Sequence, residues 1–167
     1  MTMRILAAAL SVFVATALVP DPAAAAPDAT KRSVPYYASI SASRARMRTG
    51  PARTYPASWL YQRQDLPIKV VAIFKQWRRI ADPDGTEGWM QANLLSGTRT
   101  AIVRGAGAVA LREKPVSGSR LLWRAAPGVV GRISQCGNGW CRMDVKGQAG
   151  FVQIGGLWGV EAGEVLP

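Results

Sequence analysis

The sequence of 167 residues contains no histidine, and this absence removes several kinds of chemistry at once. Ser-His-Asp and Cys-His catalytic arrangements need an imidazole, and a structural zinc centre needs more ligands than two cysteines supply. No Ser-x-x-Lys sequence offers a lysine-assisted nucleophile. We therefore expect a protein that is not an enzyme and that uses no metal and no cofactor.

Acidic residues are also few, at 10 against 21 lysines and arginines, which gives a net charge of +11. Asp82, Asp84 and Glu87 form the main acidic cluster, but Asp-Pro-Asp-Gly is typical of a turn, so we interpret it as a turn rather than a site. A strongly basic protein attracts anionic partners through its long-range field. No block of five basic residues occurs, so the charges could equally be spread over solvated faces.

Long hydrophobic runs are limited to one, at residues 5–19, which follows Arg4 and precedes a stretch of small residues. This layout is typical of a secretory signal peptide, and the run is shorter than the roughly 20 residues of a membrane span. We predict a signal peptide at residues 1–26, no transmembrane span in the mature chain, and a periplasmic or secreted location. Outside the cytoplasm, nucleic acid is not an expected partner.

The sequence has two cysteines, Cys136 and Cys141, which flank the turn sequence Gly137-Asn138-Gly139. In an oxidising compartment this spacing favours one disulfide across the two arms of a hairpin. The spacing is not Cys-x-x-Cys, which argues against a redox pair.

One hairpin pattern occurs twice, beginning at Trp77 and again at Trp140. In each copy a polar turn with glycine follows, and then a Gly-aromatic-apolar triplet, Gly88-Trp89-Met90 or Gly150-Phe151-Val152. This order is typical of an antiparallel pair with a short turn. We expect the two triplet rings to lie in the core and Trp77 and Trp140 to be half exposed.

The repeat extends beyond the hairpin, with an offset of 64 residues at Pro51 and Pro115 and of 62 at Gly88 and Gly150. Short strands in two such copies predict an all-β protein with two small barrels in tandem. The predicted parts are listed in chain order: signal peptide 1–26, flexible linker 27–43 (with an early strand near Tyr36 as the alternative), domains 44–98 and 99–160, and a loose acidic tail 161–167.

The opening motif Met47-Arg48-Thr49-Gly50-Pro51, followed by Tyr55-Pro56, resembles that of bacterial SH3-like domains of exported proteins. Gly139-Trp140-Cys141-Arg142 resembles a tandem SH3-like form found in exported proteobacterial proteins. The resemblance implies small non-catalytic barrels that bind cell-wall peptides or partner proteins. The second copy has Glu113-Lys114 where the first has Thr49-Gly50, which implies a different loop and a different specificity.

In SH3-like folds the loop beside the ligand groove carries aromatic residues, which offer rigid contact area. The candidate ligand-binding residues are Tyr55, Trp59, Tyr61, Trp77, Arg78 and Trp140. Arg48 and Arg79 are further candidates for pairing with acidic groups. The alternative is that these rings only pack and the arginines are only solvated.

Together these features predict an exported binding module of the cell envelope. It would recognise peptidoglycan peptides, an envelope protein or an anionic envelope polymer. A structural or scaffolding role in the periplasm is the alternative, with Trp123 and Trp158 as rings between the two domains. A wall hydrolase is the least favoured.

Overall fold

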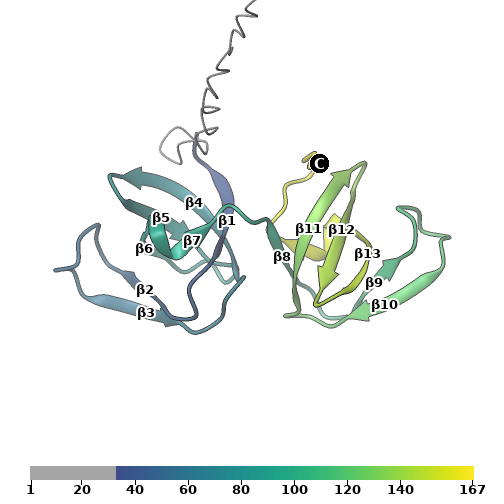
Figure 1. The fold of residues 1–167 in the computed structure, drawn as a ribbon, viewed down its shortest axis with the longest axis horizontal. Coiled ribbons are helices and arrows are strands. Elements are labelled where there is room, and N and C mark those ends of the chain that lie inside the picture. The colour runs from purple at the N-terminus through teal and green to yellow at the C-terminus, as the bar shows by residue number, and fades with distance from the viewer. Residues whose placement is uncertain (1–32) are drawn as a thin grey trace, which may run out of the picture.

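A computed structural model describes residues 33–167, so the predicted signal peptide and the first residues of the predicted linker lie outside the described part. The described chain forms two sheets of seven strands each. Figure 1 shows them as two lobes that follow one another along the chain. The prediction of an all-β protein with two small barrels in tandem is confirmed.

The first sheet has the strand order β3-β2-β6-β5-β4-β1-β7. Its elements are β1 (Tyr36–Ile40), β2 (Ala45–Arg48), β3 (Ala57–Tyr61), β4 (Pro67–Phe74), β5 (Trp77–Ala81), β6 (Glu87–Gln91), the 3-10 helix η2 (Ala92–Leu94) and β7 (Leu95–Ser96).

The second sheet repeats this order as β10-β9-β13-β12-β11-β8-β14, which confirms the duplication. Its elements are β8 (Thr100–Val103), β9 (Val109–Arg112), β10 (Leu121–Ala125), β11 (Val130–Gly137), β12 (Trp140–Val145), β13 (Gln148–Gln153), the 3-10 helix η3 (Ile154–Gly156) and β14 (Leu157–Trp158). Between residues 33 and 167, no helix has the length and apolar character needed to cross a membrane.

Strand β1 lies inside the range that the sequence assigns to a flexible linker, 27–43. It is hydrogen-bonded between β4 and β7, with Tyr36 opposite Val70 and Ser39 opposite Ser96. Residues 38–40 are buried. Their uncharged sequence Ala-Ser-Ile lacks the polar alternation that marks a strand, because the strand is covered on both sides. Residues 36–40 therefore belong to the first barrel.

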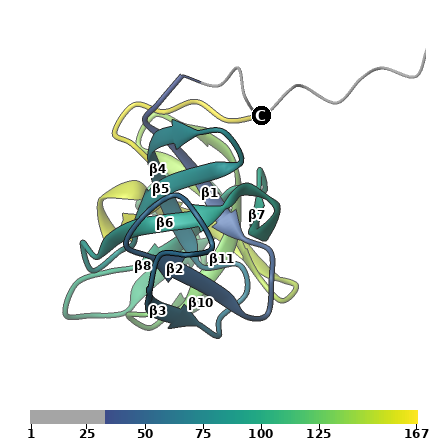
Figure 2. The same ribbon diagram turned by 90° about the vertical axis from the view of Figure 1, so that its left-hand side faces the viewer.

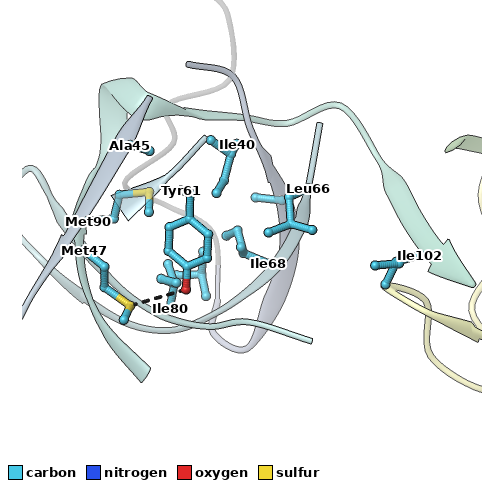
Figure 3. Close-up of a cluster of buried hydrophobic side chains, with 11 residues drawn as sticks. Ile40, Ala45, Met47, Tyr61, Leu66, Ile68, Ile80, Met90 and Ile102 are labelled. Carbon is cyan, nitrogen blue, oxygen red and sulfur yellow. Dashed lines mark hydrogen bonds between the residues drawn. The ribbon is translucent and has the colours of Figure 1, made fainter. Parts of the chain in front are cut away.

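The first barrel closes around a core to which β1, β2, β4, β5 and β6 contribute (Figure 3). Ile40, Met47, Ile68, Ile80 and Met90 are fully buried in it. The second core is built in the same way and includes Leu111, Ile133, Met143 and Val152. Each fully buried aliphatic side chain of this size contributes about 1.5–3 kcal/mol, so the two cores hold the barrels closed.

Tyr61 spans the first core and ends at the turn of the Trp77 hairpin. Its hydroxyl lies 3.8 Å from the Met47 sulfur (Figure 3) and donates a hydrogen bond to Asp82 Oδ2 at 2.9 Å. Asp82 Oδ1 accepts the backbone N–H groups of Asp84 and Thr86 at 3.0 and 2.8 Å. Burial, together with the bond to Asp82, raises the pKa of Tyr61, so the hydroxyl stays protonated. Asp82 is thus a turn residue that also anchors the core.

The disulfide between Cys136 and Cys141 is present and joins β11 to β12, which confirms that prediction. At the tip of the hairpin, Asn138 and Gly139 have φ of 50° and 80°. A two-residue turn with both φ values positive is the preferred hairpin connection, and Asn-Gly is its usual sequence. The disulfide therefore ties the two strands of this hairpin together next to the turn.

The two barrels contact each other through both apolar and polar groups. Ile102 and Trp158 of the second barrel pack against the first core, and the Trp158 ring lies edge-on to Tyr37 at 5.3 Å between centroids. Arg63 Nη2 donates to the Gly128 carbonyl at 2.7 Å, across the same boundary. Trp123, the other ring expected between the domains, is instead 44% exposed on β10.

The C-terminal segment 161–167 is docked, so the expectation of a loose tail is wrong. Leu166 packs on the second core, and its N–H donates to the Cys136 carbonyl at 3.1 Å. Arg99 donates to both carboxylate oxygens of Glu164, and Lys69 of the first barrel pairs with Glu161 at 2.7 Å. The acidic tail finds basic partners on both sides of the domain boundary, and these partners lie far away in the sequence.

We predict that Gly88→Ala destabilises the first barrel. A Cβ at Gly88 would lie 2.5 Å from Met47 Cγ and 2.9 Å from the Arg48 carbonyl oxygen. Both atoms belong to β2, so neither can move away without disturbing that strand. Overpacking of this kind costs about 1–3 kcal/mol. Unfolding in urea measures the loss. Gly118→Ala is the control, since its Cβ would meet nothing within 4 Å; equal effects of the two substitutions would contradict the prediction.

We also predict that Glu164→Gln reduces the loss of stability in acid. The hydrogen bond from Arg99 holds the pKa of Glu164 below its usual range. A lowered pKa in the folded state gives stability that is present above the ordinary glutamate pKa and is lost as the pH falls through the folded value. Urea unfolding between about pH 7 and about pH 3 measures this loss.

The glutamine variant should start less stable and lose less on acidification than the wild type. The control is Glu113→Gln, which removes a carboxylate from an exposed pair with Arg120 and should leave the acid dependence near that of the wild type. If Glu164→Gln and the wild type lost the same stability between the two pH values, the tail contact would not be contributing.

Candidate functional site

Strand β2 has two faces with different composition. Ala45 and Met47 are fully buried and point into the core. Successive side chains of a strand alternate between faces, so Arg46 and Arg48, with Arg44 just before the strand, share the outer face. Three guanidinium groups are thereby placed in a row by the same register that fills the core.

This row lines a groove of about 470 Å³ at the surface of the first barrel. A fourth arginine, Arg53, comes from the loop between β2 and β3. The other lining residues are Leu60, Trp77, Gln91 and Leu94, so no carboxylate faces the four positive charges. Among residues 33–167, the side chains of Arg44, Arg46 and Arg53 make neither an ion pair nor a hydrogen bond.

Arg48 has a different role from its three neighbours. Its Nη1 donates to the Tyr55 carbonyl at 2.6 Å and so ties the loop between β2 and β3 to the barrel. In the second barrel Arg112 makes the same bond to the Ser119 carbonyl, also at 2.6 Å. Because the bond occurs in both copies, we interpret Arg48 as a residue that positions the loop.

The aromatic residues predicted as ligand contacts lie in different places. Tyr55 and Trp59 are 46% and 56% exposed, on the loop and on β3. Trp77 forms part of the arginine groove, although only 3% of it is exposed. Tyr61 is buried against Asp82. Trp140 lines a second groove, of about 370 Å³, on the other barrel.

The predicted arginines Arg78 and Arg79 each bind other groups of the protein. Arg78 is 3% exposed, and its Nη1 donates to the carbonyls of Lys75 and Trp77 at 2.8 and 3.0 Å. Arg79 pairs with Glu87 at 2.8 Å on the surface. The six residues predicted as ligand contacts are therefore not gathered into one site, and of them Trp77 is the one that lines the arginine groove.

The expected exposure of two tryptophans is wrong. Trp77 is buried rather than half exposed, and Trp89 is half exposed rather than in the core. On β6 it is Gly88 and Met90 that point inward, and alternation then turns Trp89 outward. Phe151 on β13 is half exposed for the same reason, since Gly150 and Val152 are buried.

Three of the groove arginines were missed by the sequence analysis: Arg44, Arg46 and Arg53. The available signal was the spacing of two between Arg44, Arg46 and Arg48, which places them on one face of any strand. The position of Arg53 has no such signal, because it depends on how the loop folds back over β2.

Two small barrels with a groove at the surface of each are the architecture of tandem SH3-like binding domains. The family described as the bacterial SH3 domain matches residues 41–97 and 105–159. The chain belongs to this family and contains two of its domains. Bacterial SH3 domains are generally binding modules.

Two solved structures, of NlpC2 and NlpC1 from Trichomonas vaginalis, are similar to this chain over 77% and 76% of its length. Sequence identity is 9% and 8%, and the TM-score is 0.34 in both cases. The chain spans about half of those proteins, 49% and 46%. No curated protein matches the sequence.

We predict that Arg48→Ala destabilises the fold, whereas Arg46→Ala does not. Arg48 loses the charge-assisted bond to Tyr55, which contributes about 1–2 kcal/mol at a partly exposed position. Arg46 has no such bond, and its removal should change stability by less than about 0.5 kcal/mol. Urea unfolding compares the two, with Arg112→Ala as a second test in the other barrel. An effect of Arg46→Ala as large as that of Arg48→Ala would contradict the assignment.

Proposed function

We propose that the protein is an exported, non-catalytic binding module of the cell envelope that recognises the acidic groups of peptidoglycan peptides through its arginine groove. The observation that carries the proposal is the set of four arginines that line one groove without a carboxylate. Like charges repel and opposite charges attract, so an anion that enters the groove is attracted by all four guanidinium groups.

The chemistry of the groove suits carboxylates in particular. A guanidinium group presents a planar fork of donors that matches the two oxygens of a carboxylate. The stem peptides of a bacterial wall carry free carboxylates and small apolar side chains. Leu60 and Trp77 add apolar surface to the groove, beside the arginines, for the second kind of group.

The lining of the groove also supports a binding role rather than catalysis. Its residues are arginines, two leucines, one tryptophan and one glutamine, and they include neither a nucleophile nor a general base. Exported location is supported by the disulfide, which persists in oxidising compartments, and by the predicted signal peptide at residues 1–26.

An acidic envelope protein or an anionic envelope polymer would offer the same charged groups. The scaffolding alternative is favoured by a separate observation, the packing of the two barrels on each other through Trp158 and Tyr37. That contact is internal to the chain, so it explains how the domains are held and leaves the groove for an outside ligand.

We predict that purified cell-wall sacculi retain the protein and that the triple variant Arg44→Ala, Arg46→Ala, Arg53→Ala is retained about a hundredfold more weakly. Each lost charge-assisted contact costs about tenfold or less in affinity. Retention should fall as salt is raised, because exposed charges are screened. Co-sedimentation across a series of salt concentrations measures both effects.

The control is Lys114→Ala, Arg120→Ala, Arg124→Ala, which removes the same charge from exposed positions of the second barrel. It should bind like the wild type. Sacculi stripped of attached polymers, and sacculi with amidated stem peptides, separate the two anionic sources. No retention of the wild type at low salt, or equal loss in both triple variants, would refute the proposal.

A further inference from the structure

The second barrel carries a groove at the position equivalent to the arginine groove. It keeps three elements of the first: Trp140 stands at the position of Trp77, Gln153 at that of Gln91, and Arg112 at that of Arg48. Because Arg112 is bound to the Ser119 carbonyl, as Arg48 is to that of Tyr55, the frame of the two grooves is the same.

The unpaired positive charges of the first groove are not repeated in the second. The positions of the three unpaired arginines are taken by small uncharged residues, Ala108, Ala110 and Ser117. The lining of the second groove thus holds one positive charge, on Arg112, where the first holds four. The attraction for an anion that characterises the first groove is largely removed from the second.

One wall of the second groove differs from that of the first at two positions whose residues depend on each other. Gly156 on η3 stands where the first groove has Leu94, and Val109 stands where the first barrel has Ala45. A Cβ at Gly156 would lie 2.7 Å from Val109 Cγ1, so the valine requires the glycine. The result is a smaller groove with an aliphatic wall, about 370 Å³ against 470 Å³.

Apart from Arg112, the polar side chains that line the second groove are neutral. Gln153 Nε2 lies 3.5 Å from Ser117 Oγ, so an amide and a hydroxyl stand together on its lining. The Trp140 ring is half buried, whereas Trp77 is 3% exposed. An open ring, an aliphatic wall and neutral donors and acceptors are the features that bind the backbone amides and small side chains of a peptide.

We infer that the second groove is a separate binding site for an uncharged peptide segment with small side chains. The protein then has two grooves of different specificity, one for acidic groups and one for neutral peptide. The contrast rests on the proposed function of the first groove, but the binding of neutral peptide by the second is measured independently.

The experiment uses the full chain labelled with ¹⁵N and follows the indole N–H signals of Trp77 and Trp140, assigned through Trp→Phe variants. The probes are two blocked dipeptides, acetyl-Ala-Ala-amide and acetyl-Glu-Glu-amide. The neutral dipeptide should shift the Trp140 signal in a manner that salt does not weaken. The acidic dipeptide should shift Trp77 and bind the second groove at least about tenfold more weakly than the first.

A reciprocal variant tests the cause. Ala108→Arg with Ala110→Arg restores two of the missing charges and should strengthen binding of the acidic dipeptide at Trp140 by about tenfold. The control adds the same charge outside both grooves, as Thr86→Arg with Val165→Arg at exposed positions, and should leave the Trp140 response unchanged.

The inference is overturned if the neutral dipeptide leaves Trp140 unshifted, or if the wild-type Trp140 signal responds to the acidic dipeptide as strongly as Trp77 does. Either result is read from the wild type, so it does not depend on the arginine variant folding. A Trp77 signal that ignores the acidic dipeptide, while Trp140 responds to the neutral one, would refute the proposed function and leave the neutral site standing.

Discussion

The register of strand β2 is the constraint on which both the first barrel and its groove depend. Met47 is buried against Gly88, where a methyl group would not fit, and this contact fixes which residues of β2 face inward. Because side chains alternate, the same register presents Arg46 and Arg48 outward, in line with Arg44. A slip of one residue would turn the arginines into the core and remove them from the groove. The packing of the core therefore fixes which residues line the groove.

The two barrels share this frame and are held as one unit by contacts that run between them. In Figures 1 and 2 the edge strands β3 and β10 lie toward the same side of the molecule. Trp158 packs on the first core, Arg63 reaches the Gly128 carbonyl, and the acidic tail pairs with both Lys69 and Arg99. These contacts join groups that lie far apart in the sequence and hold the two barrels together.

Much of the fold follows from the sequence, because the signals involved are local. The repeat, the hairpins and the disulfide each depend on residues a few positions apart, as in the Asn138-Gly139 turn between the two cysteines. The docking of the tail does not follow, since Glu164 meets Arg99 from 65 residues away. The exposure of the aromatic rings does not follow from the sequence for a related reason: an aromatic ring next to glycine indicates a strand, but only the register shows that Gly88 and not Trp89 faces the core.

The duplication itself separates the residues that the fold needs from those that it does not. The loop bond of Arg48 is repeated by Arg112, so the barrel uses this arginine to close its loop. The positions of Arg44, Arg46 and Arg53 are occupied in the second barrel by alanine, alanine and serine, and that barrel has the same strand order. The same fold therefore forms in the second barrel without charges at these positions. The second barrel thus shows that this fold does not require arginines at these three positions, and this supports the binding role proposed for them.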